Sequence, residues 1–356
     1  MEKIALQTPS FRGDIYIGEG AAERLRGLAA GQKNFAVADS NVFALYPAFF
    51  ERYFSDCKIF VLPAGEENKT FENLGKILSA MAEAGLHRTS RLFAVGGGVV
   101  GDIAGLAAAL YMRGISCVQV PTTLLAQVDS GVGGKTAVDL SGVKNVVGAF
   151  FQPCEVLVDP SFVKTLPPRE IKCGLGEIVK YAALDEGIFD ALESREGGLD
   201  DLDFLVSLIP ACVRHKAKVV AADEREQGER KSLNVGHTTG HAIELSSGMS
   251  HGECVLWGML FETELAEKYG VCDGAFGERL RRLVRRALEI KPFVLPDFST
   301  IGKAAEKAKA DKKNADDGNI RMAVGVRKGE WTLFSLPFEK YRAGLEEIAG
   351  KLRARF

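Results

Sequence analysis

The feature that most constrains the fold is a regular alternation of short apolar segments and helical segments in the first third of the chain. Residues 34–39, 57–62 and 91–95 have the pattern of buried strands, and Thr70 to Ala84 places its apolar side chains on one helical face. Strands that alternate with helices form right-handed βαβ units, which build a parallel sheet with a helical layer on each face. The sequence therefore predicts a doubly wound, Rossmann-like α/β domain at the N-terminus.

A glycine-rich segment, Gly96-Gly-Gly-Val-Val-Gly-Asp102, directly follows the predicted strand 91–95. At such a junction, glycines let the backbone approach a pyrophosphate, and the next helix offers free N–H groups at its positive end. The segment lacks the Gly-x-Gly-x-x-Gly spacing, so a simple tight turn is the alternative. Its position nevertheless predicts a dinucleotide site.

Three charged residues add to this hypothesis. Asp39 ends an earlier predicted strand, where a carboxylate accepts a hydrogen bond from a ribose hydroxyl, although it would equally serve as a helix N-cap. Glu66 and Lys69 lie in a loop that would also reach the cofactor, and their alternative is a solvated surface pair.

A second glycine-rich segment, Gly131-Val-Gly-Gly-Lys135, resembles a phosphate-binding loop. Lysine supplies a point charge and glycine gives access to the backbone, so Lys135 and the later Lys144 are predicted to contact phosphate. The spacing is too short for a Walker A motif, which excludes a nucleoside triphosphate site of that kind. The alternative is a pair of solvated loop charges.

Three of the five histidines lie close together, at His237, His241 and His251. The first two are spaced i, i+4, which puts them on one helical face, and Gly248 breaks the helix so that His251 folds back. Imidazole is a common zinc ligand, and an open site uses about three protein ligands, so the pattern predicts a metal site rather than structural histidines. Glu177 would supply the third metal ligand, or would form only a structural salt bridge with Lys180.

Prolines that interrupt regular secondary structure, at Asp159-Pro160 and Leu166-Pro-Pro, predict a domain boundary near residue 160. We therefore expect an α/β domain over residues 1–160 and a mainly α-helical domain over residues 161–356. A nicotinamide cofactor in the first and a metal in the second would suit alcohol oxidation, with the metal polarising the carbinol oxygen.

Composition narrows the class of protein further. The net charge of −2 gives no indication of the basic surface that a nucleic-acid-binding protein needs. The seven cysteines are scattered without a Cys-x-x-Cys pair, which indicates a reduced, cytoplasmic protein. We expect neither a signal peptide nor a membrane span, because the most apolar stretch, residues 93–112, is interrupted by Asp102 and several glycines.

At these positions the sequence resembles the 3-dehydroquinate synthases, which belong to the sugar-phosphate cyclases, over roughly residues 14–351. The resemblance rests on Gly96-Gly-Gly-Val-Val-Gly-Asp102, Tyr111-x-Arg113-Gly, Gln119-Val-Pro-Thr-Thr-Leu-Leu-Ala-Gln-Val-Asp129-Ser, Gly133-Gly-Lys135-Thr, Lys144-Asn145, Glu177-x-x-Lys180-Tyr and Leu233-Asn-x-Gly-His-Thr-x-Gly-His241. Two departures, Gly131 in place of the usual serine and the segment 138–143, flank the predicted phosphate loop.

The resemblance implies conversion of 3-deoxy-D-arabino-heptulosonate 7-phosphate into 3-dehydroquinate and phosphate, the second step of the shikimate pathway. In this chemistry NAD oxidises a carbinol, phosphate leaves by elimination, the ketone is reduced again, and the ring opens and closes as an aldol. A stabilised enolate and fixed donors around the departing phosphate are what the elimination needs.

The resemblance also implies individual roles. The ligands of a zinc or cobalt ion would be Glu177, His237 and His251. The residues that hold NAD would be Asp39, Asn41, Glu66, Lys69, Gly97, Gly98, Val99, Asp102, Thr122, Thr123 and Lys144. The substrate phosphate would meet Lys135, Asn145, Asn234, His241 and one lysine of the pair Lys312 and Lys313. The remaining substrate groups would meet Lys180, Lys216, Arg230 and Asp129, with Glu226 in support and Arg113 reaching the site of a neighbouring subunit in a homodimer.

Three other functions share parts of this pattern. A related cyclase would make a valiolone or a deoxy-inosose, but Lys216, Arg230 and His241 follow the dehydroquinate pattern. A polyol dehydrogenase of the glycerol dehydrogenase kind would accumulate NADH and release no phosphate. A non-catalytic NAD-binding module would have no use for the predicted metal ligands and cations.

Overall fold

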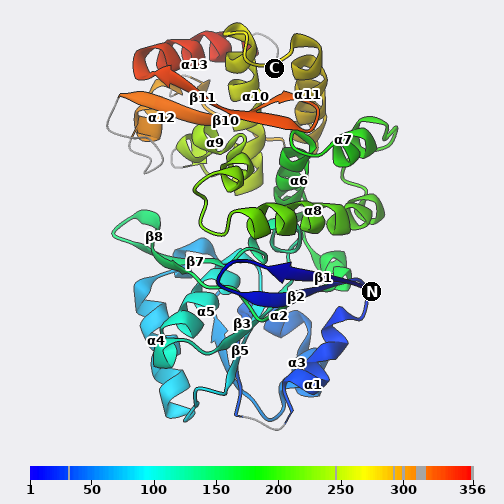
Figure 1. The fold of residues 1–356 in the computed structure, drawn as a ribbon, viewed down its shortest axis with the longest axis vertical. Helices are drawn as coiled ribbons and strands as arrows, with labels where there is room; N and C mark the ends of the chain where they lie inside the picture. Colours follow the sequence, from blue (N-terminus) through cyan, green and yellow to red (C-terminus); the bar gives the residue numbers. More distant parts are fainter. Residues whose placement is uncertain (31–32, 245–246, 292, 299–300, 310–317, 354–356) are drawn as a thin grey trace. The chain divides into compact units, whose positions relative to one another are not determined.

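The computed structural model describes residues 1–356 apart from 31–32, 245–246, 292, 299–300, 310–317 and 354–356 (Figure 1). The chain forms two compact units. The first contains Met1–Leu166 and Lys216–Arg225, and the second contains Pro167–His215 and Glu226–Phe356. The prediction of an α/β N-terminal part and a mainly helical C-terminal part is confirmed.

The first unit is built on a twisted, mostly parallel sheet (Figure 1). Within the described residues its strand order is β1-β2-β9-β6-β5-β3-β4, and only β1 runs antiparallel to its neighbour. The strands are β1 (Glu2–Gln7), β2 (Arg12–Ile17), β3 (Phe35–Asp39), β4 (Lys58–Leu62), β5 (Arg91–Gly96), β6 (Ser116–Pro121) and β9 (Glu155–Val158). The strands predicted at 34–39, 57–62 and 91–95 are therefore confirmed.

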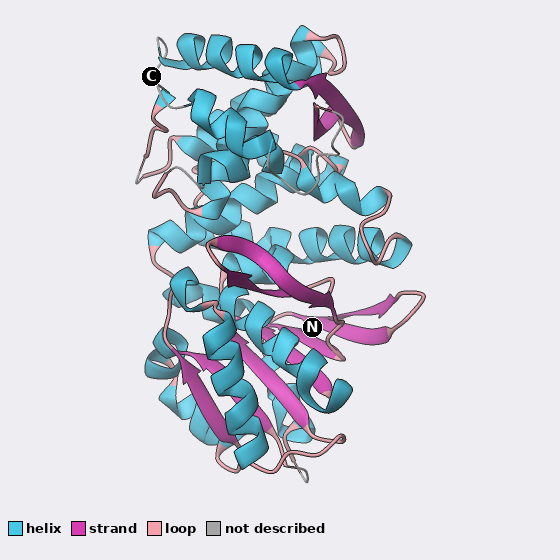
Figure 2. Cartoon of the chain, turned by 90° about the vertical axis from the view of Figure 1, so that its left-hand side faces the viewer, coloured by secondary structure: helices cyan, strands magenta, loops and turns pink. Residues whose placement is uncertain are grey.

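The apolar runs of the strands are continuous because both faces of the sheet are covered. On β3, Phe35 and Val37 belong to one core cluster, and Ala36 and Ala38 belong to the other. This division follows from the two-residue period of a strand, which sends alternate side chains to opposite faces. Figure 2 shows helices packed along the strands.

The helices divide between the two core clusters. One cluster contains side chains of α4 (Phe71–Glu83) and α5 (Gly98–Leu110), and the other contains side chains of α1 (Leu25–Leu28) and α3 (Pro47–Phe54). Thr70 begins α4, as the sequence predicts, because its hydroxyl accepts a hydrogen bond from Asn73 N at 3.1 Å. A short helix α2 (Ser40–Leu45) follows β3, and a hairpin of β7 (Lys135–Leu140) and β8 (Val143–Phe150) completes the unit.

The second unit is mainly helical and is organised around α10 (His251–Lys268) (Figure 1). This helix is buried along most of its length because it packs against several neighbours. Those neighbours include α6 (Pro168–Ala182), α9 (His237–Glu244), α11 (Gly274–Leu288) and α13 (Phe338–Arg353). The other elements are α7 (Glu186–Glu193), α12 (Ile301–Lys309), the hairpin of β10 (Asn319–Arg327) and β11 (Glu330–Pro337), and α8 (Leu202–Ala222), whose residues from Lys216 onward belong to the first unit.

No helix among the described residues is both long enough and apolar enough to cross a lipid bilayer.

Candidate active site

The two histidine-bearing helices, α9 and α10, are held together at glycines. A Cβ at Gly258 of α10 would overlap the carbonyl oxygen of Gly236 and would lie 2.6 Å from Gly240 N. Glu262 of α10 also accepts hydrogen bonds from Gly236 N at 2.9 Å and from Thr239 N at 2.7 Å. A buried carboxylate therefore caps the N-terminus of α9 from a neighbouring helix, where the helix dipole favours negative charge.

The next helix begins at His251. Ser250 is its N-cap, and Glu253 completes a capping box by accepting a hydrogen bond from Ser250 N at 3.1 Å, with a second one from Ser250 Oγ at 2.8 Å. The separation of α9 from α10 agrees with the predicted break at Gly248.

The imidazoles of α9 and α10 lie close together, and two of them contact the carboxylate of Glu177, which projects from α6. Possible ligand atoms of His237, His241 and His251 all lie within 4.8 Å of one another. Glu177 Oε1 lies 3.0 Å from His251 Nε2 and 3.5 Å from His237 Nε2. Imidazole and carboxylate groups gathered in this way are the donor types that zinc or a similar borderline cation prefers.

Hydrogen bonds to the other ring nitrogens orient two of these imidazoles. His251 Nδ1 lies 3.0 Å from Glu244 Oε2, and His237 Nδ1 lies 3.1 Å from the carbonyl oxygen of Val235. An acceptor at Nδ1 favours the tautomer whose Nε2 carries a lone pair. Both Nε2 atoms are therefore prepared to bind a cation beside Glu177.

The charges around the cluster favour the same conclusion. Burial would raise the pKa of Glu177, but the charge on Lys180 and contacts with the histidines hold that pKa well below its ordinary value. Burial lowers the pKa of His237, and the Glu177 charge offsets this only partly. For His251, burial lowers the pKa, but Glu177 and Glu244 outweigh it and raise the pKa to about 10. The positive charge of a protonated His251 is therefore stabilised between the two carboxylates, and a bound cation would replace the proton on its Nε2.

The structure brings the three predicted histidines together and places Glu177 against His237 and His251, but it does not choose three ligands among these four residues. Ring centroids are 5.1 Å apart for His237 and His241 and 5.3 Å apart for His237 and His251. The set Glu177, His237 and His251 stays a prediction. Lys180 Nζ forms an ion pair with Glu177 Oε2 at 2.6 Å, so the salt bridge considered as the alternative for Glu177 is also present.

Other predicted substrate residues of the second unit lie close to α9 in the chain. Asn234 ends the turn before α9 and donates a hydrogen bond from Nδ2 to Glu226 Oε1 at 2.5 Å. Arg230 lies in the same turn, and its side chain is buried. Lys312 and Lys313 fall outside the described residues.

In the first unit, predicted NAD residues gather at the carboxyl ends of neighbouring parallel strands. Gly97 is the N-cap of α5 after β5, and no side chain in the described part of the chain caps that helix. Thr122 follows β6, its backbone N–H bonds Gly96 O at 2.9 Å, and its buried Oγ1 has no hydrogen-bond partner among the described residues. An uncapped helix N-terminus beside a buried hydroxyl fits a pyrophosphate at this edge.

Asp39 ends β3 beside the same turn. Its Oδ1 accepts hydrogen bonds from Asn41 N at 2.8 Å and from Val42 N at 3.3 Å, so the N-cap considered as an alternative role is present. A carboxylate has two oxygens, and this cap accounts for one of them. The cap and the predicted ribose contact are therefore compatible.

Lys69 is more enclosed than the sequence indicated. Its side chain is only 5% exposed and forms ion pairs with Asp102 Oδ2 at 2.6 Å and Glu66 Oε1 at 3.6 Å. Burial lowers the pKa of Lys69, but these carboxylates outweigh it and raise the pKa above its ordinary value. The alternative of a solvated surface pair is therefore wrong for Lys69.

The remaining predicted residues of this unit are on the hairpin and around it. Lys135 begins β7, Lys144 and Asn145 lie on β8, and Arg113 sits in a left-handed conformation at φ 66°. Lys216 forms an ion pair with Asp129 Oδ2 at 2.9 Å and donates to the Asp129 carbonyl at 2.7 Å.

Sequence reasoning missed two supporting residues in this unit. Asp139 Oδ1 accepts from Asn145 N at 2.8 Å, and Asp139 N donates to Lys69 O at 2.8 Å, so one residue connects two predicted contacts. Ser130 Oγ has no hydrogen-bond partner among the described residues and would lie 3.1 Å from a Cβ at Gly98. Ser130 follows Asp129 in a motif that the family resemblance includes, so its position in that motif could have identified it.

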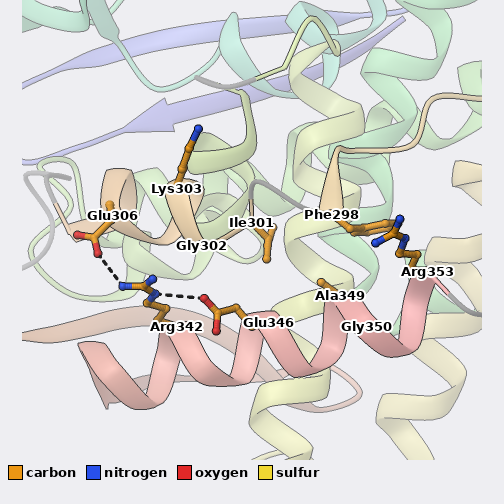
Figure 3. Close-up of a pocket in the computed structure, with 10 residues that line it drawn as sticks. All are labelled: Phe298, Ile301, Gly302, Lys303, Glu306, Arg342, Glu346, Ala349, Gly350 and Arg353. Carbon is orange, nitrogen blue, oxygen red and sulfur yellow. Dashed lines mark hydrogen bonds and ion pairs between the residues drawn. The ribbon is translucent and has the colours of Figure 1, made fainter.

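A cavity of about 440 Å³ lies apart from all these residues, along α12 and α13 (Figure 3). Arg342 at its wall is occupied by ion pairs with Glu306 at 3.3 Å and Glu346 at 3.2 Å. None of the predicted site residues that the structure describes lines it.

Comparison with known proteins now bears on this arrangement. Residues 59–173 match the family described as 3-dehydroquinate synthase N-terminal, and residues 174–314 match 3-dehydroquinate synthase C-terminal. The chain belongs to the 3-dehydroquinate synthase family. It is 40% identical to the 3-dehydroquinate synthase of Alkaliphilus metalliredigens, covering 92% of this chain and 94% of that one. It is 43% identical to that of Caldanaerobacter subterraneus subsp. tengcongensis, covering 95% and 98%.

Solved structures of other enzymes share the family fold. A 2-deoxy-scyllo-inosose synthase complexed with carbaglucose-6-phosphate, NAD+ and Co2+ superposes with a TM-score of 0.84 at 26% identity, covering 97% of this chain and 99% of that one. A 2-epi-5-epi-valiolone synthase from Streptomyces hygroscopicus with NAD+ and Zn2+ bound gives 0.81 at 26% identity, covering 95% and 97%. A probable glycerol dehydrogenase from Sinorhizobium meliloti gives 0.60 at 18% identity, covering 95% and 97%, which shows a shared fold.

Proposed function

We propose that this chain converts 3-deoxy-D-arabino-heptulosonate 7-phosphate into 3-dehydroquinate and phosphate. The observation that carries the proposal is identity of 40% and 43% to two 3-dehydroquinate synthases across more than nine-tenths of the chain. The convergence of Glu177 with His237 and His251 supplies the chemistry that such an activity requires. The enzyme would act in the cytoplasm as a homodimer, with Arg113 reaching the neighbouring subunit's site.

NAD is proposed to bind at the carboxyl edge of β3, β5 and β6. The uncapped N-terminus of α5 and the backbone at Gly97 would receive the pyrophosphate. Asp39 would accept a hydrogen bond from a ribose hydroxyl, and the unpartnered Oγ1 of Thr122 would bond the cofactor. The ion pair of Lys69 with Asp102 would hold the loop that follows β4 against this edge.

A divalent zinc or cobalt ion is proposed to bind Glu177, His237 and His251. When bound, such an ion polarises a carbinol or carbonyl oxygen and stabilises the enolate that forms before elimination. Lys180, which is paired with Glu177 in a buried position, would present its ammonium to the substrate's hydroxyl or carboxylate oxygens. Asn234 and His241 would donate to the phosphate, so that negative charge on the leaving group is stabilised as its bond breaks.

The activity is tested by following phosphate and NADH together in the full-length protein. We expect phosphate release from the heptulosonate substrate with NAD present in catalytic amounts, without accumulation of NADH. Exhaustive chelation should abolish the release, and added Zn²⁺ or Co²⁺ should restore it. Stoichiometric NADH without phosphate would instead identify a polyol dehydrogenase, and activity unchanged by chelation would contradict the proposed metal.

A second candidate is a cyclase that acts on a hexose phosphate. The similarity to 2-deoxy-scyllo-inosose synthase, with a TM-score of 0.84, favours testing it. Sequence identity favours the dehydroquinate activity, because it is 26% to that synthase and 43% to a dehydroquinate synthase. Phosphate release from glucose 6-phosphate, with none from the heptulosonate, would reverse this choice.

Glu244 provides a prediction about the metal site that does not depend on turnover. Glu244→Gln should weaken Zn²⁺ or Co²⁺ binding by about 10- to 100-fold, the usual effect of losing an outer partner of a ligand histidine. The physical reason is that the amide removes the charge opposite His251 Nδ1, which lies 3.0 Å from the carboxylate. Metal titration of the purified protein measures the effect. The matched control is Glu347→Gln on α13, whose carboxylate pairs with Lys268 and Lys351 at the surface and should leave metal affinity unchanged.

A further inference from the structure

A buried ion pair joins α6 to α10 beside the histidine cluster. Lys172 Nζ lies 3.1 Å from Glu253 Oε1, and the two side chains are only 1% and 5% exposed. Neither residue belongs to the predicted ligands or substrate contacts. Charged side chains are rarely buried this completely, because desolvating both ions costs free energy that their attraction must offset.

The lysine end of this pair is held by a third helix. Lys172 Nζ also donates hydrogen bonds to the carbonyl oxygens of Leu288 at 3.1 Å and Ile290 at 2.8 Å. These carbonyls are at the C-terminal end of α11, where helix carbonyls lack partners within the helix and the dipole favours a cation. The ammonium is therefore fixed in position by α11 as well as by Glu253.

The glutamate end fixes the start of α10. Glu253 Oε2 accepts a hydrogen bond from Ser250 N, which is its half of the capping box, and a second one from Ser250 Oγ. Ser250 immediately precedes His251, so the carboxylate that pairs with Lys172 also determines where the backbone of His251 begins the helix.

We propose that Lys172 and Glu253 are positioning residues that set the register between Glu177 and His251. The α6 helix carries Lys172 and Glu177, and α10 carries Glu253 and His251, so the two pairs cross-link the same two helices. Glu177 and His251 would hold the metal, whereas the ion pair is made by residues outside the predicted site. The inference rests on the proposed metal-dependent function.

Backbone contact explains why register needs a separate constraint. A Cβ at Gly176 would lie 2.5 Å from Gly252 Cα, and a Cβ at Gly252 would lie 2.7 Å from the carbonyl carbon of Cys173. Glycine therefore lets the backbones of α6 and of the start of α10 touch, which fixes their separation. Because glycines have no side chains that interlock, they do little to prevent one helix from sliding along the axis of the other. The directional ion pair of Lys172 with Glu253 would prevent this sliding.

The free energy of unfolding of single and double variants distinguishes a positioning role of the ion pair from a purely stabilising one. Removing one member of a buried ion pair leaves an uncompensated charge, whereas removing both charges is often close to neutral for stability. A variant that lacks both charges should therefore recover the stability that single variants lose. If the pair sets the register, that variant should still bind metal poorly.

The experiment compares Lys172→Met, Glu253→Gln and the double variant K172M/E253Q in the full chain. Gln at position 253 keeps the capping box, because a capping box accepts Glu or Gln at this position. Thermal unfolding measures stability, and titration with Co²⁺ measures affinity and, through its visible spectrum, ligand geometry. We expect both single variants to lose stability, and the double variant to regain it while binding Co²⁺ about 10- to 100-fold more weakly than the wild type.

Glu253→Asp gives a second route if the other variants do not fold. It keeps both charges but shortens one side chain, so it should shift the register and weaken Co²⁺ binding about tenfold or more. The control is the double variant R279M/E193Q, which removes an ion pair between α11 and α7 and should leave Co²⁺ affinity unchanged.

The outcomes distinguish this inference from the proposed function. Wild-type affinity and spectrum in K172M/E253Q or in Glu253→Asp would overturn the positioning role while leaving the metal site intact. A wild-type protein that binds neither Co²⁺ nor Zn²⁺ would overturn the proposed metal function, and the positioning role with it.

Discussion

His237→Ala should lose the metal, whereas His241→Ala should keep it and lose turnover. His237 Nε2 lies 3.5 Å from Glu177 Oε1, and its Nδ1 is occupied by the Val235 carbonyl, so its lone pair is directed at the proposed ion. Removing a ligand should cost metal affinity at least about 100-fold, the upper end of what loss of an outer partner costs. The family resemblance places His241 at the substrate phosphate, where its loss would slow elimination without releasing the ion.

Metal content after dialysis and the rate of phosphate release together decide this prediction. His87→Ala is the control, because His87 is exposed in the first unit and belongs to neither predicted site. If His241→Ala instead empties the site, the helical i, i+4 spacing identified the ligands correctly and the family correspondence was wrong. All three imidazoles lie within 4.8 Å of one another, so proximity alone does not separate these outcomes.

Much of the first unit follows from sequence because its strands are buried on both faces. Along β3, alternate residues enter opposite core clusters, so every position is apolar and the strand is recognisable without its neighbours. The order of the strands was not available in the same way. The order depends on which strands pair with one another in the folded chain, and the local sequence pattern of a strand does not indicate its neighbours.

In the candidate site, too, features that are local in the sequence could be predicted, whereas features that depend on tertiary contacts could not. Clustered histidines and a glycine-rich turn after a strand are visible in the chain, and the structure brings each group together. The burial of Lys69 against Asp102 was misjudged, since a charged loop looks solvated until its partner is known. Lys172 and Glu253 were missed as a pair for the same reason, because each looks like an ordinary charge on a helix.

Gly258→Ala should strongly destabilise the second unit. Its Cβ would overlap the carbonyl oxygen of Gly236 and lie 2.6 Å from Gly240 N, and both of these are backbone atoms that cannot rotate away. Overpacking of this kind typically costs about 1–3 kcal/mol and sometimes more. We expect lower thermal stability and much weaker metal binding, because α9 carries His237 and α10 carries His251.

Gly350→Ala is the matched control, since no atom of the described residues lies within 4 Å of a Cβ at this position on α13. The same substitution there should stabilise the protein by about 0.5–1 kcal/mol, because alanine loses less conformational entropy than glycine in a helix. Unfolding curves and Co²⁺ titrations of both variants measure the contrast. Wild-type metal affinity in Gly258→Ala would show that α9 can move away from α10 without disturbing the ligands. The close contact of these helices would then be a matter of packing alone, and the geometry of the site would have to be set by the hydrogen bonds of Glu262 and Glu244.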